Sequence, residues 1–469
     1  MRFLFFLIIL ATVICKPDLG VSQSSQSDPP KALRPDIQVD YVMEAAPRSV
    51  RIDLDPISKD LYYNTLDGDI FRITSSGEDT LVFKSEDHGV TIMQEMLFHE
   101  KDLFVIGNIS VNEDRGMEGK VMRGRLQENG ERIWSILAES AEYGSMMSAF
   151  GHAFSGAVID PAGEYIYVNS GARTDHGEIQ DNQGAYPDHR ERAITSVIFK
   201  LPLDGEKIYL PDDIDKLQEM GVIFVDGVRN MFSMAFSPKG QLFGVDNSGD
   251  YHHPEGMYWL REGHHYGFPW IIGGKENPQQ FPDFKADPST DHGLNRFAHA
   301  VNLGLFYNDP NFPKMPENLT VTSPIQNIGP DANYYMDLNT GSVYKGDEVG
   351  RTIGTFTPHR SPLGLFFDSD SLLINEFQGD AFVLSYTASS SALLRSFYQD
   401  KPEMSEDLMH LELMYSKDFD NYVVRTKRIV ENFSGPTDAV LVNNEVYVIN
   451  NKGRQPSHIW KITMPTSDK

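Results

Sequence analysis

Cysteine is almost absent from this sequence, because Cys15 is the only one among its 469 residues. Disulfides, cysteine-built zinc sites and thiol nucleophiles are therefore excluded from the body of the chain. Positive charge is also scarce: 41 Lys and Arg residues stand against 67 Asp and Glu residues, a formal net charge of −26. A chain this acidic repels phosphate backbones and anionic membrane surfaces, which argues against nucleic acid as a partner.

Long hydrophobic runs and several common catalytic motifs are absent as well. No segment approaches the roughly 20 apolar residues that a membrane-spanning helix needs, so no transmembrane span is predicted. The sequence has no Walker loop, no GxSxG elbow, no HExxH and no GxGxxG in a supporting context. A serine hydrolase and a nicotinamide enzyme are therefore disfavoured, and the absence of CxxCH excludes covalently attached haem.

The N-terminus has the pattern of an export signal. Residues 1–15 begin with a short basic segment and continue with an apolar run that ends at Cys15. They are predicted to be a cleaved signal peptide or a lipoprotein signal with a lipid anchor at Cys15, although the preceding residue is a bulky isoleucine. Residues 16–38, rich in Ser, Gln, Asp and Pro, are predicted to form a flexible tether. We expect an extracytoplasmic protein that is periplasmic, secreted or lipid-anchored.

The body of the chain repeats one pattern of alternating apolar and polar residues interrupted by turns. Hydrophobic residues make up 40 % of the chain and aromatic residues 11 %, enough for a large core. The pattern occurs six times, at residues 50–73, 96–107, 156–168, 233–245, 363–374 and 438–449. Each copy reads as two or three short antiparallel strands, and a unit this small must stack on its neighbours. Residues 39–469 are therefore predicted to form an all-β, six-bladed β-propeller, with a pair of two-sheet sandwiches as the alternative.

Two other segments stand out from the repeats. Residues 212–220 form the only convincing amphipathic helix pattern, with acidic residues at its start. Residues 275–356 are rich in Pro, Asn and Asp and carry few alternating runs. Long insertions of this kind usually cover a functional face, so this one is predicted to be a loop-rich wall or lid over one end of the ring.

Charged and polar residues gather in the loops beside the repeated strands. His152 precedes the third copy, and Arg229 and Asn230 precede the fourth. Arg229 offers a rigid fork of donors suited to carboxylate or quinone oxygens, whereas Asn230 both donates and accepts. A structural histidine and a loop arginine paired with an acid are the alternatives. Residues 170–180, which include Arg173, are either a site lining or a loop anchor.

A further loop, residues 246–255, combines carboxylates, an amide and glycines within ten positions. Oxygen-rich material of this kind is what calcium selects, although the spacing is not that of an EF-hand. His252 and His253 are adjacent, so they point to opposite sides of an extended backbone and are not expected to bind one zinc ion together. An acidic solvated loop is the alternative.

Taken together, these residues resemble the glucose/sorbosone dehydrogenase family, the soluble aldose dehydrogenases that use pyrroloquinoline quinone (PQQ). The resemblance spans residues 50–464 and is strongest across 225–269, where Arg-Asn is followed by a strand, a turn, a strand, an acidic loop and Tyr-Gly-Phe-Pro. Residues 152–171, 361–367 and 434–462 resemble other blades of that family. The family fold is a six-bladed propeller, as the repeats predict independently.

The resemblance implies roles for particular residues. His152 would be the general base that takes the proton of the sugar hydroxyl. Arg229 and Asn230 would contact the quinone oxygens, and Arg229 would stabilise the negative charge that develops there. Calcium would be bound by Glu255 and by the backbone carbonyls of a further set of residues. That set is Asn247, Ser248, Gly249 and Tyr266.

The sequence departs from the family where basic residues hold the carboxylates of PQQ. At those positions it has Thr387 and, at 435–437, Gly-Pro-Thr. A polyanion inside an acidic chain needs local cations. Arg173, His359 and Arg360 are the candidates to replace them, since they lie in loops predicted to face the same end of the ring.

Three classes of function follow from these observations. The first is an extracytoplasmic dehydrogenase that oxidises an aldose sugar or a related alcohol with PQQ and calcium and passes electrons to a separate acceptor. The second is a propeller without cofactor that binds a carbohydrate or another partner. The third is a calcium-dependent hydrolase of the lactonase type, which would need a central ion held by side chains from several blades.

Overall fold

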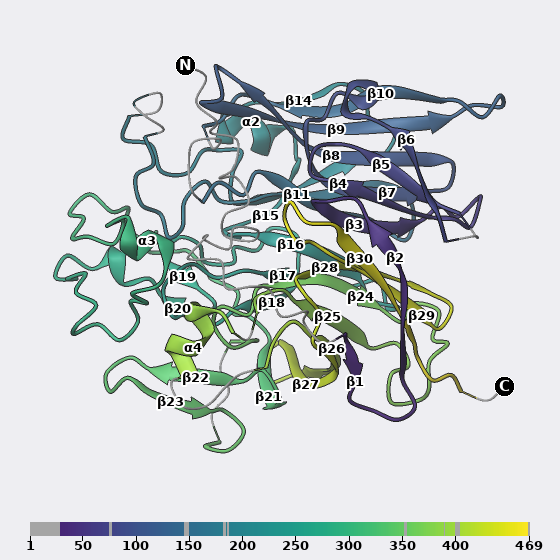
Figure 1. Cartoon of the computed structure of the whole chain (residues 1–469). Helices are drawn as coiled ribbons and strands as arrows, with labels where there is room; N and C mark the ends of the chain where they lie inside the picture. The colour runs from purple at the N-terminus through teal and green to yellow at the C-terminus, as the bar shows by residue number, and fades with distance from the viewer. Residues whose placement is uncertain are drawn as a thin grey trace.

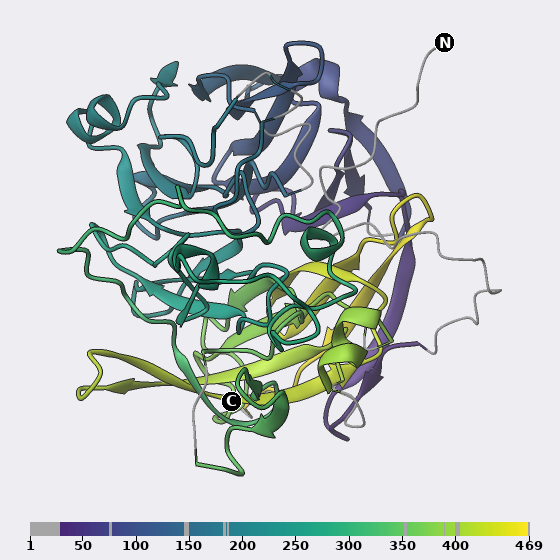
Figure 2. The same ribbon diagram turned by 90° about the vertical axis from the view of Figure 1, so that its left-hand side faces the viewer.

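The computed structural model describes residues 29–74, 77–144, 150–181, 184, 187–350, 354–388, 390–398 and 404–467. Strands dominate this part of the chain and form six main sheets around a common centre (Figures 1 and 2). The prediction of a six-bladed β-propeller is therefore confirmed, and the sandwich alternative is wrong.

The six blades contain between three and six strands each. The first is β3 Ser49–Leu54, β4 Leu61–Thr65, β5 Ile70–Ile73 and β6 Asp79–Phe83; the second is β7 Ile92–His99, β8 Asp102–Val111, β9 Gly116–Leu126, β10 Arg132–Ser140 and β14 Ile208–Leu210; the third is β11 Phe154–Ile159, β12 Tyr165–Ser170, β13 Val197–Pro202 and β15 Ile223–Asp226. The fourth is β16 Met231–Phe236, β17 Leu242–Asp246 and β18 Gly256–Leu260; the fifth is β24 Pro362–Phe367, β25 Ala381–Ser385, β26 Leu408–Ser416, β27 Asn421–Glu431, β1 Lys31–Ala32 and β21 Gln326–Pro330; the sixth is β28 Pro436–Val442, β29 Glu445–Asn450, β30 Ser457–Thr463 and β2 Gln38–Ala45.

The inner strands of the blades form a closed ring. In order they are β3, β7, β11, β16, β24 and β28, and each packs against the next. Strand β28 packs in turn against β3, which closes the circle. Each blade alone would leave both faces of a small sheet in water, so contact between neighbours supplies the burial that keeps it folded.

The sixth blade is built from both ends of the chain. Strand β2 pairs antiparallel with β30, with Val39 opposite Ile462, and in Figure 1 the purple β2 lies beside the yellow β30. Upstream of β2, β1 pairs with β27 and Ile37 is buried. The predicted tether is therefore wrong for residues 31–38, because they pair and pack against the propeller. The signal and Cys15 predictions lie outside the described residues.

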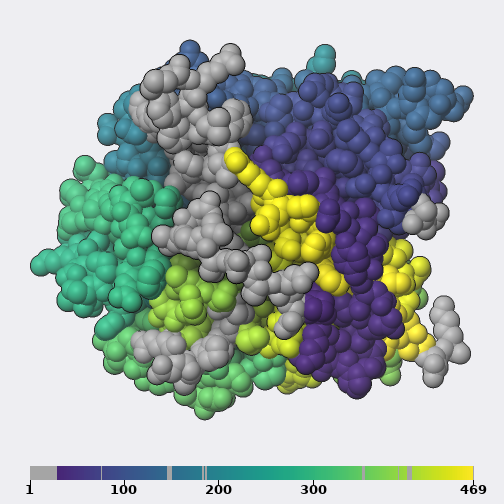
Figure 3. All heavy atoms as spheres, viewed as in Figure 1, coloured from purple at the N-terminus to yellow at the C-terminus, as the bar shows by residue number. Residues whose placement is uncertain are grey.

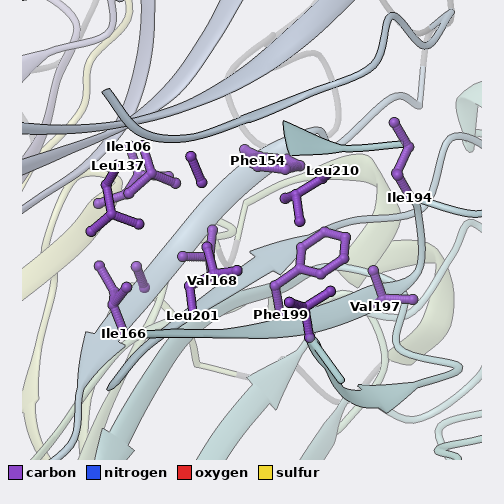
Figure 4. Close-up of a cluster of buried hydrophobic side chains, with 14 of the residues drawn as sticks. Ile106, Leu137, Phe154, Ile166, Val168, Ile194, Val197, Phe199, Leu201 and Leu210 are labelled. Carbon is purple, nitrogen blue, oxygen red and sulfur yellow. The ribbon is translucent and has the colours of Figure 1, made fainter. Parts of the chain in front are cut away.

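The hydrophobic core lies between neighbouring blades. Figure 4 shows the cluster between the second and third blades, where Ile106 and Leu137 face Phe154, Val168 and other side chains of the next blade. The apolar positions come from the alternation of each strand, since every second side chain points to the same face of a sheet. The blades therefore stack face to face like the sectors of a disc.

Every inner strand carries a β-bulge near its start. The register shifts lie between Ser49 and Arg51, Met93 and Glu95, Phe154 and Ala157, Met231 and Ser233, Pro362 and Leu365, and Pro436 and Asp438. A bulge bends its strand and re-aims the adjoining chain. Because these bulges follow the loops that contain His152, Asn230 and Arg360, they help to direct those loops toward the axis of the ring.

The insertion predicted at 275–356 has short elements of its own. They are β20 Lys275–Glu276, which pairs with β19 Ile271–Ile272, then η1 Pro278–Gln280, α3 His299–Asn302, β21, β22 Tyr334–Asp337 and β23 Ser342–Lys345. In Figure 3 most of this segment forms the green lobe on the left of the molecule. It is fixed to the propeller because β21 joins the fifth blade beside β27.

Helices are few and short in the described part of the chain. They are α1 Ser85–His88, α2 Ile214–Glu219, α3 and α4 Ala392–Tyr398. The predicted helix at 212–220 contains α2, whose N-terminus is capped because the Asp213 carboxylate accepts a hydrogen bond from the Lys216 N–H. None of these described helices has the length and apolar composition needed to cross a bilayer.

One arginine ties several blades together at the centre. Arg51, on β3, is 1 % exposed and donates hydrogen bonds to the carbonyls of Gln94 and Phe232, at 2.9 and 2.5 Å. Its guanidinium also forms ion pairs with Glu95 at 3.1 Å and Asp438 at 3.5 Å. These partners belong to the inner strands of the second, fourth and sixth blades or to their flanks.

Candidate functional site

The loops that precede β11, β16 and β24 meet at one end of the ring. We call this region the central site and define it by His152, Asp175, Arg229, Asp250 and Glu255. These side chains come from loops of the third and fourth blades. Hydrogen bonds link them to one another and to the loop before the fifth blade: Arg229 bonds to Asp175, the Asp250 N–H bonds to Asp175, and Glu255 accepts from the Ser361 N–H. The predicted convergence of these loops is therefore present.

His152 lies in the loop before β11 and is 6 % exposed. Its Nδ1 lies 3.0 Å from the carbonyl oxygen of Ala172, and a carbonyl can only accept, so Nδ1 carries the proton. Nε2 then holds a lone pair, and it has no hydrogen-bond partner among the described residues. Burial, helped by the charge of Arg229, lowers the pKa of His152 to about 3. The ring is neutral, and it is a weak base as it stands.

Arg229 is held by its neighbours on all sides. Nε donates to the Asp175 carbonyl at 2.7 Å, Nη2 to the Asp175 carboxylate at 2.9 Å, and Nη1 to the Asn247 carbonyl at 3.0 Å. The side chain is 3 % exposed. Arg229 and Asp175 therefore form a buried ion pair in which the two charges cancel. The backbone N–H groups of Arg229 and Asn230 both donate to the Asp246 carboxylate, which orients the loop.

Asp175 also contacts other buried side chains of its own loop, which follows β12. Its Oδ2 lies 3.0 Å from Nδ1 of His176, whose ring stacks on Phe306 of the insertion at 3.8 Å. Burial opposes ionisation, but the bond from His176 and the charge of Arg229 outweigh it and hold the pKa of Asp175 below its usual range. Burial lowers the pKa of His176, but the charges of Glu178 and Asp175 raise it by a larger amount, so the net shift is upward. For this charge-dense stretch, residues 170–180, the sequence leaves two roles open, a site lining and a loop anchor.

Two carboxylates of the site carry no cation. Oε2 of Glu255 accepts from the Ser248 N–H at 2.8 Å, and Oδ2 of Asp250 accepts from the Ala300 N–H at 2.6 Å. Among the described residues, neither forms an ion pair. Burial raises the pKa of each to about 7, and for Asp250 the charge of Asp175 adds to the effect. Asp250 is not among the predicted site residues, although its position in the acidic loop 246–255 is a signal for it.

A small cavity of about 10 Å³ is lined in part by Arg229. Its lining includes Asn247, Ser248 and Tyr266, three of the five predicted calcium ligands, together with Arg229 and Asp246. A volume of this size holds one water molecule or one ion. Glu255 and Gly249 are not among the lining residues; a side chain at Gly249 would instead meet the Asp175 carboxylate at 2.9 Å.

The oxygen atoms around this cavity are of the chemical type that binds a hard cation. Burial raises the pKa of Asp246 to about 6 despite two backbone N–H bonds, as expected for a carboxylate that lacks a counter-charge. Asp246 and the nearby carbonyl oxygens are ligand types that calcium accepts. Among the described residues, however, no group of three or more His, Cys, Asp or Glu side chains could hold a metal.

The arginines predicted to hold a polyanion are committed elsewhere. Arg360 is fully buried and donates to both oxygens of Asp407 at 2.8 Å, whereas Arg173 donates to backbone carbonyls, including that of Arg190 at 2.8 Å. Both are 0 % exposed. These contacts anchor loops of the protein, and a role of the two arginines in holding a cofactor stays a prediction.

His359 does lie near the centre, but it is not a cation. Its Nε2 lies 2.7 Å from Nδ1 of His252, and burial lowers its pKa to about 4. Burial also lowers the pKa of His252 well below its ordinary value. The pair is therefore neutral. At Thr387, where the resemblance implies a basic residue, the hydroxyl lies 2.9 Å from the hydroxyl of Ser361.

A substitution at Gly171 tests how tightly His152 is positioned. A Cβ there would lie 2.5 Å from the Cβ of His152 and 3.1 Å from the Arg229 carbonyl oxygen. We expect Gly171→Ala to displace the imidazole and to destabilise the fold by about 1–3 kcal/mol, as overpacking does. Urea unfolding measures the stability, and the ring nitrogen chemical shifts of His152 report the displacement.

Gly263→Ala is the matched control for this test. Gly263 has φ +77°, and nothing lies within 4 Å of a Cβ built on it. It should therefore lose stability through backbone strain alone and leave the His152 shifts unchanged. Unchanged His152 shifts in Gly171→Ala would show that the ring is not confined as described.

Comparison with known proteins shows the architecture but not a family. No family model matches the sequence, and no curated protein matches it. Among solved structures, the soluble aldose sugar dehydrogenase of Escherichia coli, in its apo form, has a TM-score of 0.53 at 12 % identity, over 91 % of this chain and 99 % of the other. The holo PQQ domain of pyranose dehydrogenase from Coprinopsis cinerea has a TM-score of 0.52 at 12 % identity, over 94 % and 98 %. The chain therefore has the six-bladed propeller fold seen in sugar dehydrogenases.

Proposed function

We propose that the central site binds a sugar or a related polyhydroxylated alcohol. The observation that carries this proposal is the unpartnered Nε2 of buried His152, in a site that also holds the buried Asp250 and Asn230. Hydroxyl groups donate and accept, so a polyol can satisfy acceptors and amides together. The two sugar dehydrogenases compared with this chain have the same fold, which supports the choice of ligand class.

PQQ does not fit the described residues of this site. The cofactor carries several carboxylates, and a buried carboxylate needs a cation or a set of donors. Arg229 is already neutralised by Asp175, and Arg360 is paired with Asp407. Asp250 and Glu255 are two further acids in the same region, and burial raises the pKa of each to about 7. A quinone with several carboxylates would therefore enter a region whose arginines are already paired with acids.

A dehydrogenase is the second candidate because His152 and Arg229 do lie together, as the resemblance implies, but the described residues do not supply the free cations that PQQ needs. It would require PQQ, calcium and a separate electron acceptor, and the export signal would place it outside the cytoplasm. Calcium would be held by Asp246 and by oxygens of Asn247, Ser248 and Tyr266. The lactonase alternative has less support, since the described residues offer no metal cluster contributed by several blades.

One experiment separates these functions. Binding of a panel of aldoses and sugar alcohols to the purified protein is measured by calorimetry, with and without PQQ and calcium, and dye reduction is followed in parallel. We expect binding without cofactor and at least a tenfold loss of affinity in His152→Ala. His99→Ala, in the β7–β8 hairpin, is the control and should bind normally.

Each other outcome has a definite meaning. If no sugar or polyol binds under any condition, the proposal is overturned. Dye reduction that requires PQQ and calcium and disappears in both His152→Ala and Arg229→Ala would replace it with the dehydrogenase. Hydrolysis of sugar lactones without PQQ would replace it with the lactonase.

A further inference from the structure

We infer that residues 295–312 of the insertion form a lid over the central site, and that the ion pair between Arg190 and Asp309 is the latch that holds this lid closed. The inference rests on the proposed function and goes further, because it names how a ligand enters the same site. It follows from the small space around the site, from the contacts that cover it, and from the way in which the covering segment is attached.

The described conformation has little room for a sugar at the central site. The five residues that define the site are between 0 % and 8 % exposed. The cavity that Arg229 lines has a volume of about 10 Å³, whereas pockets for small organic ligands usually measure about 300–1,000 Å³. A sugar can therefore reach His152 only after a covering segment has moved.

The lid covers the loops that carry the site. Figure 2 looks onto the left-hand side of Figure 1, and there the green insertion lies toward the viewer. The ring of Phe306 stacks on that of His176, with centroids 3.8 Å apart, and the Ala300 N–H donates to the Asp250 carboxylate at 2.6 Å. Phe306 and Ala300 also belong to one apolar cluster with Phe150, in the loop before β11. The lid therefore packs on loops of both the third and the fourth blade.

The lid is attached by side chains rather than by a shared sheet. The four-residue helix α3 is its one regular element, and within the described part of the chain no blade strand pairs with it. Parts of a fold that lie outside its sheets open at a lower free energy than the core strands do. Because opening would uncover the apolar contacts of Phe306, we expect the open state to be a minor population.

Arg190 holds the C-terminal end of the lid. Its Nη2 donates to the Asp309 carboxylate and its Nη1 to the Gly177 carbonyl, each at 2.6 Å. The guanidinium also lies 5.3 Å from the centre of the Phe312 ring. Arg190 belongs to the third-blade loop that follows β12, whereas Asp309 and Phe312 belong to the lid. The Asp309 side chain is 4 % exposed, so loss of Arg190 would leave a buried carboxylate without its cation and would favour the open lid.

Thiol labelling tests whether the lid opens. Cys15 is the only cysteine of the chain, so in a Cys15→Ser background one introduced thiol reports on one position. Ala300 in the lid and Ala138 on β10 are both 0 % exposed. We expect Ala300→Cys to react with a maleimide at least tenfold faster than Ala138→Cys under native conditions. Equal rates overturn the lid. Amide hydrogen exchange of the wild-type protein repeats the test without a substitution, since residues 295–312 should exchange faster than β11 and β16.

Arg190→Met tests the latch. We expect it to speed the labelling of Ala300→Cys at least tenfold and to leave that of Ala138→Cys unchanged. The control is Arg425→Met, which removes an ion pair at the surface and should change neither rate. If Arg190→Met does not fold, Asp309→Asn, which has nearly the same shape as the wild-type residue, takes its place. An unchanged labelling rate of Ala300→Cys overturns the assignment of the latch.

Ligand binding connects the lid to the proposed function. The association rates of the aldoses and sugar alcohols named above are measured by stopped flow for the wild-type protein and for Arg190→Met. We expect the rate to rise at least fivefold in the variant, because a larger fraction of the molecules is open. An unchanged rate shows that the segment does not control entry and overturns the inference. If no sugar binds either protein, the proposed function fails and the gating role fails with it, whereas fast labelling of Ala300→Cys would show that the segment opens even so.

Discussion

Replacing Arg51 with methionine is expected to destabilise the protein by about 3–5 kcal/mol, the usual cost of removing one partner from a buried ion pair. Methionine is of similar length, so the loss is mainly one of charge and hydrogen bonding. It would leave Glu95 and Asp438 without their cation and the carbonyls of Gln94 and Phe232 without a donor. Equilibrium unfolding in urea measures the change.

The arginine also acts across the ring, which increases the expected effect. Its guanidinium lies 3.9 Å from the centre of the Phe232 ring, and Glu95 additionally accepts from the Ala157 N–H of the third blade. Burial raises the pKa of Glu95 to about 8 even with Arg51 in place. Without Arg51, Glu95 should hold its proton still more strongly, which limits the loss of stability at neutral pH and makes the loss larger above about pH 8, where the wild-type acid ionises.

A surface pair provides the control. Arg425→Met removes an ion pair to Glu412 whose side chains are 42 % and 40 % exposed, so the loss should stay below about 1 kcal/mol. If Arg51→Met is as stable as Arg425→Met, the central arginine is not a structural tie. Adding Glu95→Gln to Arg51→Met should recover part of the stability, since it removes one of the two uncompensated acids.

A chain that begins at residue 46 is expected not to form a stable monomer. It lacks β1 and β2, so β30 loses its outer partner and presents an open edge. It also loses the buried side chains of Ile37 and Met43, and removing a core side chain of this size costs about 2–5 kcal/mol. The sum approaches the whole stability of a typical domain, about 5–15 kcal/mol.

Thermal unfolding and size-exclusion chromatography of two truncated chains test this expectation. The chain that begins at residue 29 keeps both strands and should melt within a few degrees of the full chain. The chain that begins at residue 46 should aggregate or show no cooperative transition. Similar melting of the two chains would mean that β2 is dispensable for closing the ring.

The fold could be predicted because its signal is local. Each repeat encodes two strands and a turn within about a dozen residues, and six such units leave few alternatives to a ring. The sixth blade is predicted from residues 438–449. The predicted tether, however, extends to residue 38, which is the first residue of the outer strand β2. Nothing near residue 38 shows that its partner lies at Thr463, since that pairing depends on closure of the whole ring.

The same distinction between what the sequence predicts and what only the tertiary structure shows applies to the site. The sequence by itself determined which residues enter the loops at the central end of the ring, because His152 and Arg229 precede strands whose alternation is plain. Only the tertiary structure decided what each charge does there. Arg173 and Arg360 look as available as Arg229 in the sequence, yet Arg360 is paired with Asp407 and Arg229 with Asp175. A charge acts through whatever lies within a few ångströms of it, and residues far apart in the chain become neighbours only when the blades close into a ring.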